Sequence, residues 1–326
     1  MTIPVTTGAS TAASFPSGPA TSGPATTSPA ATGPAANSYV GRFAPSPTGP
    51  LHFGSLLAAL ASWLDARHHQ GRWLLRIEDL DPLRESATAP TRIMAQLLQL
   101  GLYWDGEPLL QSQRLQAYQA ALETLINKQL VFPCTCSRSQ LPAVYPGTCC
   151  NQAFASTRTD HAIRFRLAAD TSLQLDDRVL GRQTWQLQQT LGDFVVKRKD
   201  GLFAYQLAVT VDDAYQQVTH VVRGSDLLDS SPRQACLGAA LGYPPLTYAH
   251  IPLALDQQGL KLSKSTQAAA VPKSTPSACI RQALGILGQP QWPQIDDLPL
   301  LLTTASQHWS IDRVPKCLAL AVPQEL

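Results

Sequence analysis

Two segments that lie far apart in the sequence carry groups that could bind a triphosphate and help it react. In the first, residues 42–55, we expect a strand to end in a Pro- and Gly-rich loop and a helix to begin beside His52 and Gly54. Glycine lets the backbone approach an anion, and the unpaired N–H groups at a helix N-terminus favour phosphate. His52 can donate a hydrogen bond to a phosphate oxygen as charge builds in an in-line displacement. By itself, such a pattern more often marks an ordinary turn with a surface histidine.

The second segment is residues 259–265, with the sequence Gly-Leu-Lys-Leu-Ser-Lys-Ser. Lys261 and Lys264 stand three residues apart, with Ser263 between them, on what we expect to be a loop. Such a loop can close over a triphosphate and neutralise the pyrophosphate as it leaves. Alone, a run of this kind is more commonly a solvated basic loop.

A third candidate for chemistry is a cluster of thiols. Four of the seven cysteines lie between Cys134 and Cys150, and this clustering favours a metal site over disulfides. Zinc takes four tetrahedral ligands, and closed structural sites are usually rich in cysteine. Cys134, Cys136 and Cys149 supply three ligands, and chemistry alone nominates Cys150 as the fourth. The alternative is a set of free thiols without metal. The remaining cysteines are interpreted as core or surface residues: Cys236, Cys279 and Cys317.

Composition limits what surrounds these groups. The chain has 326 residues, of which 25 are Lys or Arg and 23 are Asp or Glu, giving a formal net charge of +2. This excludes a polycation that coats nucleic acid by charge alone, so an RNA partner would need a local basic patch. No run approaches the roughly 18–20 apolar residues of a membrane helix. Residues 1–38 lack the features of secretory and mitochondrial signals, and their Ala, Gly, Pro, Ser and Thr predict a disordered leader. We expect a cytoplasmic protein.

The elements that must position the candidate groups follow an alternating pattern. Apolar runs predict strands at 39–44 and 73–77, and helical spacing of apolar residues predicts a helix between them and others at 91–100 and 114–130. Strand, helix and strand in this order imply a parallel sheet. The pattern changes between 133 and 192, which predicts an insertion that begins with the cysteines and continues through a strand at 162–167 and short polar segments. The α/β pattern then returns, with strands at 193–196, 218–224 and 251–255, and the chain after 271 reads mostly helical.

Together, the first two segments resemble a known pair of motifs. His52-Phe53-Gly54-Ser55 and Lys261-Leu262-Ser263-Lys264-Ser265 resemble the H-I-G-H and K-M-S-K-S signatures of class I aminoacyl-tRNA synthetases. Ser55 replaces the second histidine, which leaves His52 as the only histidine for that role. Four further stretches resemble the glutamyl-tRNA synthetase subfamily: 42–46, 76–79, 208–213 and 220–226. The resemblance covers essentially residues 39–273.

This resemblance implies an α/β fold in which a Rossmann-type parallel sheet is split by a small zinc-containing insertion and followed by a helical C-terminal segment. The expected organisation is a leader at 1–38, a first catalytic half at 39–133, the insertion at 134–192, a second catalytic half with the basic loop at 193–270, and a helical segment without an anticodon-binding domain at 271–326.

The resemblance also implies two binding sites. Catalytic roles fall to His52, Lys261 and Lys264, and ATP, accompanied by Mg²⁺, would be bound by these residues with Gly54, Ser55 and Ser263. L-Glutamate would be bound by Arg42, Phe43, Ala44, Pro45, Ser46, Glu78, Tyr205 and Arg223. An arginine fork can bind a carboxylate through two hydrogen bonds, Glu78 would pair with the α-ammonium, and the Tyr205 hydroxyl would select a polar substrate. Taken singly, each arginine is equally well explained by a structural salt bridge.

For the metal, the resemblance indicates a different fourth ligand from the one that chemistry nominates. It implies one structural Zn²⁺ on Cys134, Cys136, Tyr145 and Cys149, with Cys150 as the rival to Tyr145. Because a phenol has a pKa near 10, the metal would have to displace the proton of Tyr145.

Length indicates which branch of the family is involved. Roughly sixty residues follow Lys264, too few for the domain-sized anticodon-binding region of ordinary glutamyl-tRNA synthetases. The chain therefore resembles the glutamyl-queuosine tRNA(Asp) synthetase family. This implies a monomeric ligase that activates glutamate with ATP and attaches it to queuosine in the anticodon loop of tRNA(Asp), with neither DNA nor a membrane as partner. The alternatives are a glutamyl-tRNA synthetase-like enzyme that charges a tRNA 3′ end, and a silent nucleotide- or RNA-binding paralogue.

Overall fold

The protein is described from a computed structural model, which covers residues 39–83, 85–154, 160–169, 171–256, 258–259, 271 and 275–322. The predicted leader, 1–38, lies outside these residues. So do Lys261, Ser263 and Lys264, and the loop predicted around them.

The first parallel unit is built from the segment that contains His52. Strand β1 (Val40–Phe43) is followed by helix α1 (Phe53–His68) and strand β2 (Arg72–Ile77), which pairs in parallel with β1 from Val40↔Arg72 to Phe43↔Leu75. The two-residue strand β3 (Leu109–Leu110) continues the sheet beyond β2. Both long strands are almost entirely buried, as expected of parallel strands covered on both faces. The predicted strand–helix–strand unit is confirmed.

Two further helices were expected from apolar periodicity, and both are present with slightly different bounds. They are α2 (Ala89–Gln99) and α3 (Leu115–Asn127), the latter preceded by the 3₁₀ helix η1 (Gln111–Arg114).

The cysteine-rich segment begins at the end of a second, antiparallel sheet. Strand β4 (Val131–Cys134) pairs with β5 (Ala162–Phe165), and β5 pairs with β8 (Phe194–Lys197). The 3₁₀ helix η2 (Arg138–Gln140) and the one-turn helix α4 (Leu187–Thr190) lie between these strands in sequence. This sheet includes residues on both sides of the expected insertion, whose boundaries at 134 and 192 stay predictions.

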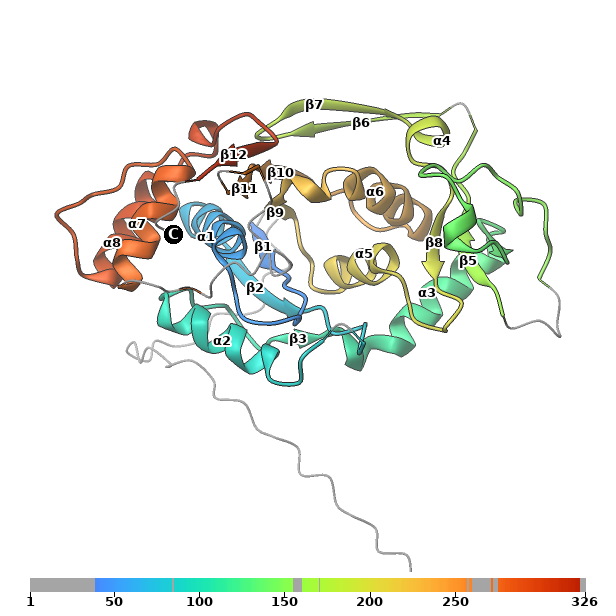
Figure 1. Ribbon diagram of the computed structural model, residues 1–326, viewed down its shortest axis with the longest axis horizontal. Helices are drawn as coiled ribbons and strands as arrows, with labels where there is room; N and C mark the ends of the chain where they lie inside the picture. Colours follow the sequence, from blue (N-terminus) through green and yellow to red (C-terminus); the bar gives the residue numbers. More distant parts are fainter. Residues whose placement is uncertain are drawn as a thin grey trace, which may run out of the picture. The chain divides into compact units, whose positions relative to one another are not determined.

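The short polar segments of the expected insertion form a hairpin. Strand β6 (Ser172–Asp177) pairs with β7 (Gly181–Gln186), and Gly181 has a positive φ of 73° where the second strand starts. Figure 1 shows this hairpin reaching from α4 towards β10, where Asp177 of β6 pairs in parallel with Tyr248. The hairpin of the expected insertion therefore joins the sheet that contains β10.

That sheet contains β9 (His220–Gly224) and β10 (Thr247–Ile251), which pair in parallel along their whole length. Helix α5 (Tyr205–Tyr215) precedes β9, while the 3₁₀ helix η3 (Ser225–Leu227) and helix α6 (Ser230–Leu241) follow it. The prediction of a single strand at 251–255 was wrong. Pro252, which has no N–H to donate, separates β10 from the short strand β11 (Leu253–Leu255).

The C-terminal part is helical, as expected, except for one strand. Helices α7 (Pro276–Ile286) and α8 (Leu298–His308) pack beside α1 (Figure 1) and share its apolar core. The 3₁₀ helix η5 (Ile311–Arg313) leads to β12 (Ala319–Ala321), which pairs in parallel with β11. Among the described helices, none has the length and apolar character needed to cross a membrane.

Candidate active site and metal centre

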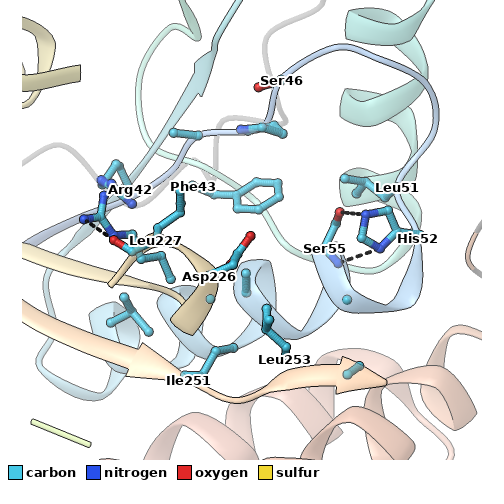
Figure 2. Close-up of a pocket in the computed structure, with 18 of the residues that line it drawn as sticks. Arg42, Phe43, Ser46, Leu51, His52, Ser55, Asp226, Leu227, Ile251 and Leu253 are labelled. Carbon is cyan, nitrogen blue, oxygen red and sulfur yellow. Dashed lines mark hydrogen bonds between the residues drawn. The ribbon is translucent and has the colours of Figure 1, made fainter. Parts of the chain in front are cut away.

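A pocket of about 410 Å³ opens where the parallel strands β1, β9 and β10 end. Strand β1 adjoins β9, since the Val40 N–H donates to the Thr219 hydroxyl and the Thr219 N–H donates to the Val40 carbonyl, both at 2.9 Å. Ligands of open α/β sheets bind at the carboxyl ends of such strands. Figure 2 shows Arg42 at one end of the pocket and His52 with Ser55 at the other.

The pocket gathers residues that are widely separated in sequence. Most of the residues predicted for ATP and glutamate line it: Arg42, Phe43, Ala44, Pro45, Ser46, His52, Gly54, Ser55, Tyr205 and Arg223. Glu78 is not part of the lining, but its N–H donates to the Pro45 carbonyl at 3.1 Å. Lys261, Ser263 and Lys264 lie outside the described residues, so their roles stay predictions.

His52 caps the N-terminus of α1 and is held there by Ser55. The Ser55 N–H donates to Nδ1 at 3.2 Å, and the Ser55 hydroxyl lies 3.0 Å from Nε2 (Figure 2). Because Nδ1 accepts a hydrogen bond, the neutral ring carries its proton on Nε2. The Nε2–H of His52 is thus directed at the Ser55 hydroxyl, and both groups lie at a helix start, where backbone N–H groups favour phosphate.

Arg42 is 4% exposed and keeps most of its donors available. Its Nε donates to Oδ1 of Asp213 at 3.3 Å, which is its one hydrogen bond within the described part of the chain. The two terminal nitrogens are thus left for a ligand that enters the pocket. A guanidinium in this state can bind a carboxylate through two parallel hydrogen bonds.

The charge of Arg42 belongs to a buried network on β1, β2 and α5. Asp213 also forms an ion pair with Arg76, whose Nη1 lies 2.8 Å from Oδ1 of Asp213, and Nη2 of Arg76 lies 3.6 Å from Oε1 of Glu78. Burial pushes the pKa of Asp213 upward, but Arg76 and Arg42 outweigh it and hold that pKa below its usual value. Such pairing is required because an isolated buried charge is very costly.

Glu78 is the carboxylate of this network that lacks a hydrogen bond among the residues that the structure describes. Its side chain is 8% exposed, and its buried Oε1 accepts no hydrogen bond from any described residue. Burial raises the pKa of Glu78 to about 7, against the opposing effect of Arg76 and Arg42. A positively charged donor from a ligand would satisfy this oxygen and stabilise the carboxylate.

Arg223, in contrast, is nearly saturated by protein acceptors. Its Nε–H donates to Nε2 of His250 at 3.2 Å, and Nη1 donates to Oε1 of Gln234 at 2.9 Å. Nη2 donates to the Ser231 hydroxyl at 2.8 Å and to the Leu227 carbonyl at 3.3 Å. Of the five N–H groups of this guanidinium, one on Nη1 remains. Arg223 therefore offers a fixed charge and a single donor, where Arg42 offers an open fork.

Tyr205, at the first turn of α5, lies among these charges. Burial raises the pKa of Tyr205, while Arg223 and Arg42 act in the opposite direction. The hydroxyl therefore keeps its proton at neutral pH and can serve as a donor in the pocket.

Sequence reasoning assigned no role to several lining residues, of which Asp226 is the most polar. Its side chain lies between Arg42 and His52 in Figure 2. A Cβ at Gly224 would come within 2.6 Å of Asp226 Oδ1, so any larger residue there would displace the Asp226 side chain. The sequence did offer one signal for Asp226. It lies three residues after Arg223, in the stretch 220–226 that resembles the glutamyl-tRNA synthetase subfamily.

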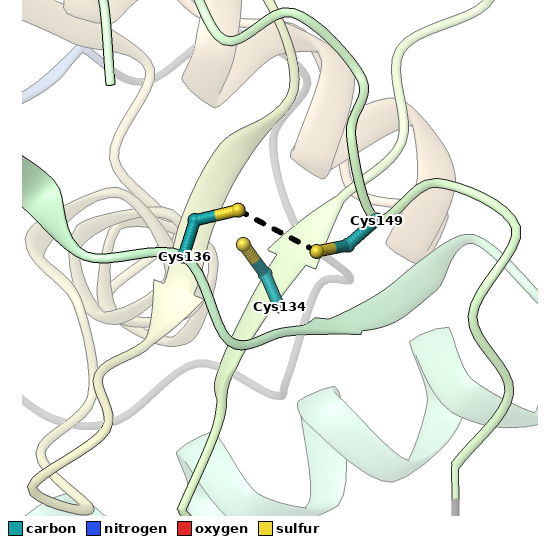
Figure 3. A group of neighbouring side chains, drawn as sticks. All are labelled: Cys134, Cys136 and Cys149. Carbon is teal, nitrogen blue, oxygen red and sulfur yellow. Dashed lines mark hydrogen bonds between the residues drawn. The ribbon is translucent and has the colours of Figure 1, made fainter. Parts of the chain in front are cut away.

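The thiols of Cys134, Cys136 and Cys149 converge on one point, with all three sulfur atoms within 4.8 Å of one another (Figure 3). The sulfur atoms of Cys136 and Cys149 are 3.6 Å apart. Burial alone would raise the pKa of Cys149, but hydrogen bonds from the Thr135 backbone and from Tyr145 lower it to about 7. A thiolate is the form that binds a metal, so this donor set fits a metal ion.

Tyr145 approaches the same point. Its hydroxyl lies 3.6 Å from Sγ of Cys134 and accepts a hydrogen bond from the Cys149 N–H at 2.7 Å. The sulfur of Cys150 is not part of the converging group. Of the two candidates for a fourth ligand, the geometry favours Tyr145.

Comparison with known proteins agrees with this arrangement. The family model described as the catalytic domain of class I tRNA synthetases (E and Q) matches residues 39–145 and 149–278. A protein of Thiobacillus denitrificans named glutamyl-Q tRNA(Asp) synthetase is 51% identical over 295 residues, which cover 87% of this chain and 97% of the relative. A protein of the same name from Pseudomonas putida KT2440 is 48% identical over 280 residues, covering 85% and 91%.

Solved structures show the same fold. The glutamate-tRNA synthetase of Elizabethkingia anophelis has a TM-score of 0.74 at 24% identity, covering 89% of this chain and 69% of its own. The glutamate tRNA ligase of Elizabethkingia meningosepticum, solved in complex with its amino acid, has a TM-score of 0.72 at 25% identity, covering 89% and 68%. The chain therefore belongs to the class I tRNA synthetase (E and Q) family and, within it, to the glutamyl-Q tRNA(Asp) synthetases.

Proposed function

We propose that this protein is a ligase that activates L-glutamate with ATP and transfers it to queuosine in the anticodon loop of tRNA(Asp). One observation supports this most strongly. A single pocket combines the start of α1 with an open arginine fork and a fixed arginine charge, beside a Glu78 oxygen that accepts no hydrogen bond from the described residues. This set of groups complements an acidic amino acid next to a nucleotide. The names of the close relatives supply the tRNA and its modified base.

In the proposed complex, Arg42 binds one carboxylate of glutamate through both terminal nitrogens. Arg223 contributes its charge and its remaining N–H, and the Tyr205 hydroxyl donates a further hydrogen bond. Glu78 accepts from the α-ammonium. Phe43, Ala44, Pro45 and Ser46 line the same pocket and would complete the glutamate site. An apolar analogue would leave these buried polar groups unpaired and would bind poorly.

In the first step, the α-carboxylate of glutamate attacks the α-phosphorus of ATP. A bond from the carboxylate oxygen to phosphorus forms, and the bond to the bridging oxygen of pyrophosphate breaks. His52, the Gly54 N–H and the Ser55 hydroxyl at the start of α1 stabilise the phosphate charge. Lys261, Ser263 and Lys264 would hold the departing pyrophosphate. Mg²⁺ would come with the nucleotide, which is how proteins usually bind it.

In the second step, a hydroxyl of the queuosine cyclopentenediol attacks the acyl carbon of the glutamyl-adenylate, and AMP leaves. The hydroxyl needs to be positioned more than activated, because the adenylate is already a reactive acyl donor. A nucleotide of a single-stranded loop can be splayed out to reach such a pocket.

For the metal centre, we propose one structural Zn²⁺ bound by Cys134, Cys136, Tyr145 and Cys149. Bound there, the ion would fix the segment after β4 to the β4–β5–β8 sheet. Four protein ligands leave no open position, so the site would take no part in the reaction.

We expect the KM for glutamate to rise as the pH falls through about 7, because Glu78 is then increasingly protonated in the free protein. A neutral Glu78 loses the charge that pairs with the substrate ammonium, whereas above this pH the carboxylate is ionised and available. The measurement is the KM for glutamate and for ATP at a series of pH values. Glu78→Gln is the control, with a raised glutamate KM that no longer follows this titration. A wild-type glutamate KM that does not change across this range would contradict the assignment.

The transfer step is tested with tRNA(Asp) prepared with and without queuosine. We expect labelled glutamate to be incorporated only into the queuosine-containing tRNA, because the nucleophile belongs to that base. Nucleoside analysis of the product should locate the label on queuosine. Equal incorporation into both tRNAs would refute base modification and favour charging of the 3′ end. Absence of glutamate-dependent ATP–pyrophosphate exchange by the folded protein would favour a silent paralogue.

A further inference from the structure

Arg223 is held by a buried chain of hydrogen bonds that starts on the β6–β7 hairpin. Oδ2 of Asp177, the last residue of β6, lies 2.6 Å from Nδ1 of His250 on β10. Nε2 of His250 lies 3.2 Å from Nε of Arg223. His250 is 0% exposed, and neither Asp177 nor His250 lines the pocket. His250 therefore reaches the pocket through Arg223 and through the Ser231 hydroxyl, which lies 3.1 Å from Nε2 and itself accepts from Arg223.

The donors and acceptors fix the direction of this chain. The Nε–H of Arg223 can only donate, so Nε2 of His250 must accept and the ring proton must sit on Nδ1. The orientation of the Asp177 carboxylate is fixed by its other oxygen. Oδ1 accepts the backbone N–H groups of Val179, Leu180 and His250 at 3.0, 2.9 and 3.1 Å. Only Oδ2 then faces the imidazole.

The electrostatics agree with a neutral imidazole. Burial lowers the pKa of His250, and although the hydrogen bond to Asp177 acts in the opposite direction, the net pKa is below the usual value. Burial also pushes the pKa of Asp177 upward, but His250 and the backbone N–H groups keep it below its usual value. The carboxylate is therefore ionised and the imidazole can accept from Arg223 at neutral pH.

We propose that Asp177 and His250 are positioning residues for glutamate binding. Asp177 holds His250 in the tautomer whose Nε2 accepts from Arg223, and this hydrogen bond orients the Arg223 guanidinium. This inference rests on the proposed function, in which Arg223 binds the substrate. With its other donors engaged by Gln234, Ser231 and Leu227, Arg223 presents one N–H to the pocket, and the plane of the guanidinium decides where that N–H points. A rotation of the plane would move that donor away from the substrate.

The decisive variant is Asp177→Asn. Its Oδ1 must continue to accept the three backbone N–H groups, so the new amide nitrogen faces Nδ1 of His250 and donates to it. The imidazole proton then moves to Nε2, where it can be donated to the Ser231 hydroxyl at 3.1 Å, and Arg223 loses its acceptor on His250. We expect the glutamate KM to rise about tenfold to a hundredfold, as for a lost hydrogen bond to a charged group, while the ATP KM stays within about twofold. A residue with only a structural role would not separate these two constants.

Two variants of His250 provide a matched comparison. A glutamine can place its carbonyl oxygen near the position of Nε2 and accept from Arg223, although it loses the link to Asp177. An asparagine can place its amide near the position of Nδ1 and donate to Asp177, but it does not reach Arg223. We expect His250→Asn to raise the glutamate KM more than His250→Gln, at similar midpoints of thermal unfolding. Equal glutamate KM values in the two variants would overturn the inference.

A spectroscopic measurement tests the tautomer without activity. The chain contains seven histidines, and comparison with His250→Gln assigns the nitrogen-15 signals of His250. The wild type should show the proton on Nδ1, and Asp177→Asn should show it on Nε2. A wild-type proton on Nε2 would overturn the inference.

Failure of the inference is distinguishable from failure of the proposed function. If the wild type catalyses no glutamate-dependent exchange, the proposed function fails, while the tautomer measurement still decides the geometry. If the wild type is active and the glutamate KM of Asp177→Asn is unchanged, the positioning role fails alone.

Discussion

Replacing Arg42 with alanine should lower kcat/KM for glutamate about thirtyfold to several thousandfold. Removal of one partner of a buried, hydrogen-bonded charge pair costs about 2–5 kcal/mol, which corresponds to this range. The variant loses the open fork that we assign to a substrate carboxylate. No other described arginine that lines the pocket can replace it, because Arg223 has one donor left. Glutamate-dependent ATP–pyrophosphate exchange measures the effect.

The fold should survive this substitution, because Asp213 keeps its ion pair with Arg76 at 2.8 Å. Arg42→Lys retains the charge without the fork and should give an intermediate loss. Arg92→Ala, on the exposed side of α2, is the control arginine and should leave the exchange unchanged. An Arg42→Ala protein that unfolds at the wild-type temperature and has nearly wild-type kcat/KM would show that Arg42 is only a structural ion-pair partner.

The second large effect is expected at the metal centre. The wild type should contain about one zinc ion per chain, and Cys134→Ser should contain almost none, because a serine hydroxyl does not ionise to replace a thiolate ligand. Structural zinc contributes about 10 kcal/mol or more to the stability of small metal-dependent units, so the segment that it fixes should also unfold at a lower temperature. Elemental analysis and thermal unfolding, with and without a chelator, measure the two effects.

Two further substitutions resolve the fourth ligand. Tyr145→Phe removes the oxygen that lies 3.6 Å from Sγ of Cys134, and should weaken zinc binding. Cys150→Ser changes a thiol that is not part of the converging group, and should retain zinc. The opposite result would establish Cys150 as the ligand. A wild-type protein purified without any metal would instead favour free thiols.

The two arginines show why the identity of a residue does not determine its availability. From the sequence, Arg42 and Arg223 are equivalent candidates for bidentate carboxylate binding. Among the described residues, Arg42 has one hydrogen-bond acceptor whereas Arg223 has four. The difference arises because Arg223 lies between β10 and α6, which supply His250, Ser231 and Gln234.

The sequence alone determined the features that depend on a few neighbouring residues. The β1–α1–β2 unit follows from apolar runs separated by a Pro- and Gly-rich turn, and the place of His52 at a helix start follows from the same turn. The cysteine spacing brought three candidate ligands into one segment. Family membership was also predictable, because motifs such as residues 52–55 and 261–265 are short and contiguous. Local spacing encodes such features directly, since the turn chemistry and side-chain periodicity involved span only a few residues.

Only the tertiary structure decided which partners those residues have. Arg42 and Asp213 are 171 residues apart, and His250 and Asp177 are 73 residues apart, with no local pattern that links either pair. The pairing of β6 with β10, the break at Pro252 and the partnership of β11 with β12 likewise depend on segments that meet only after folding. The physical reason is that a hydrogen-bond donor in the core is consumed or left free by whatever group packs against it. That group is selected by the whole fold.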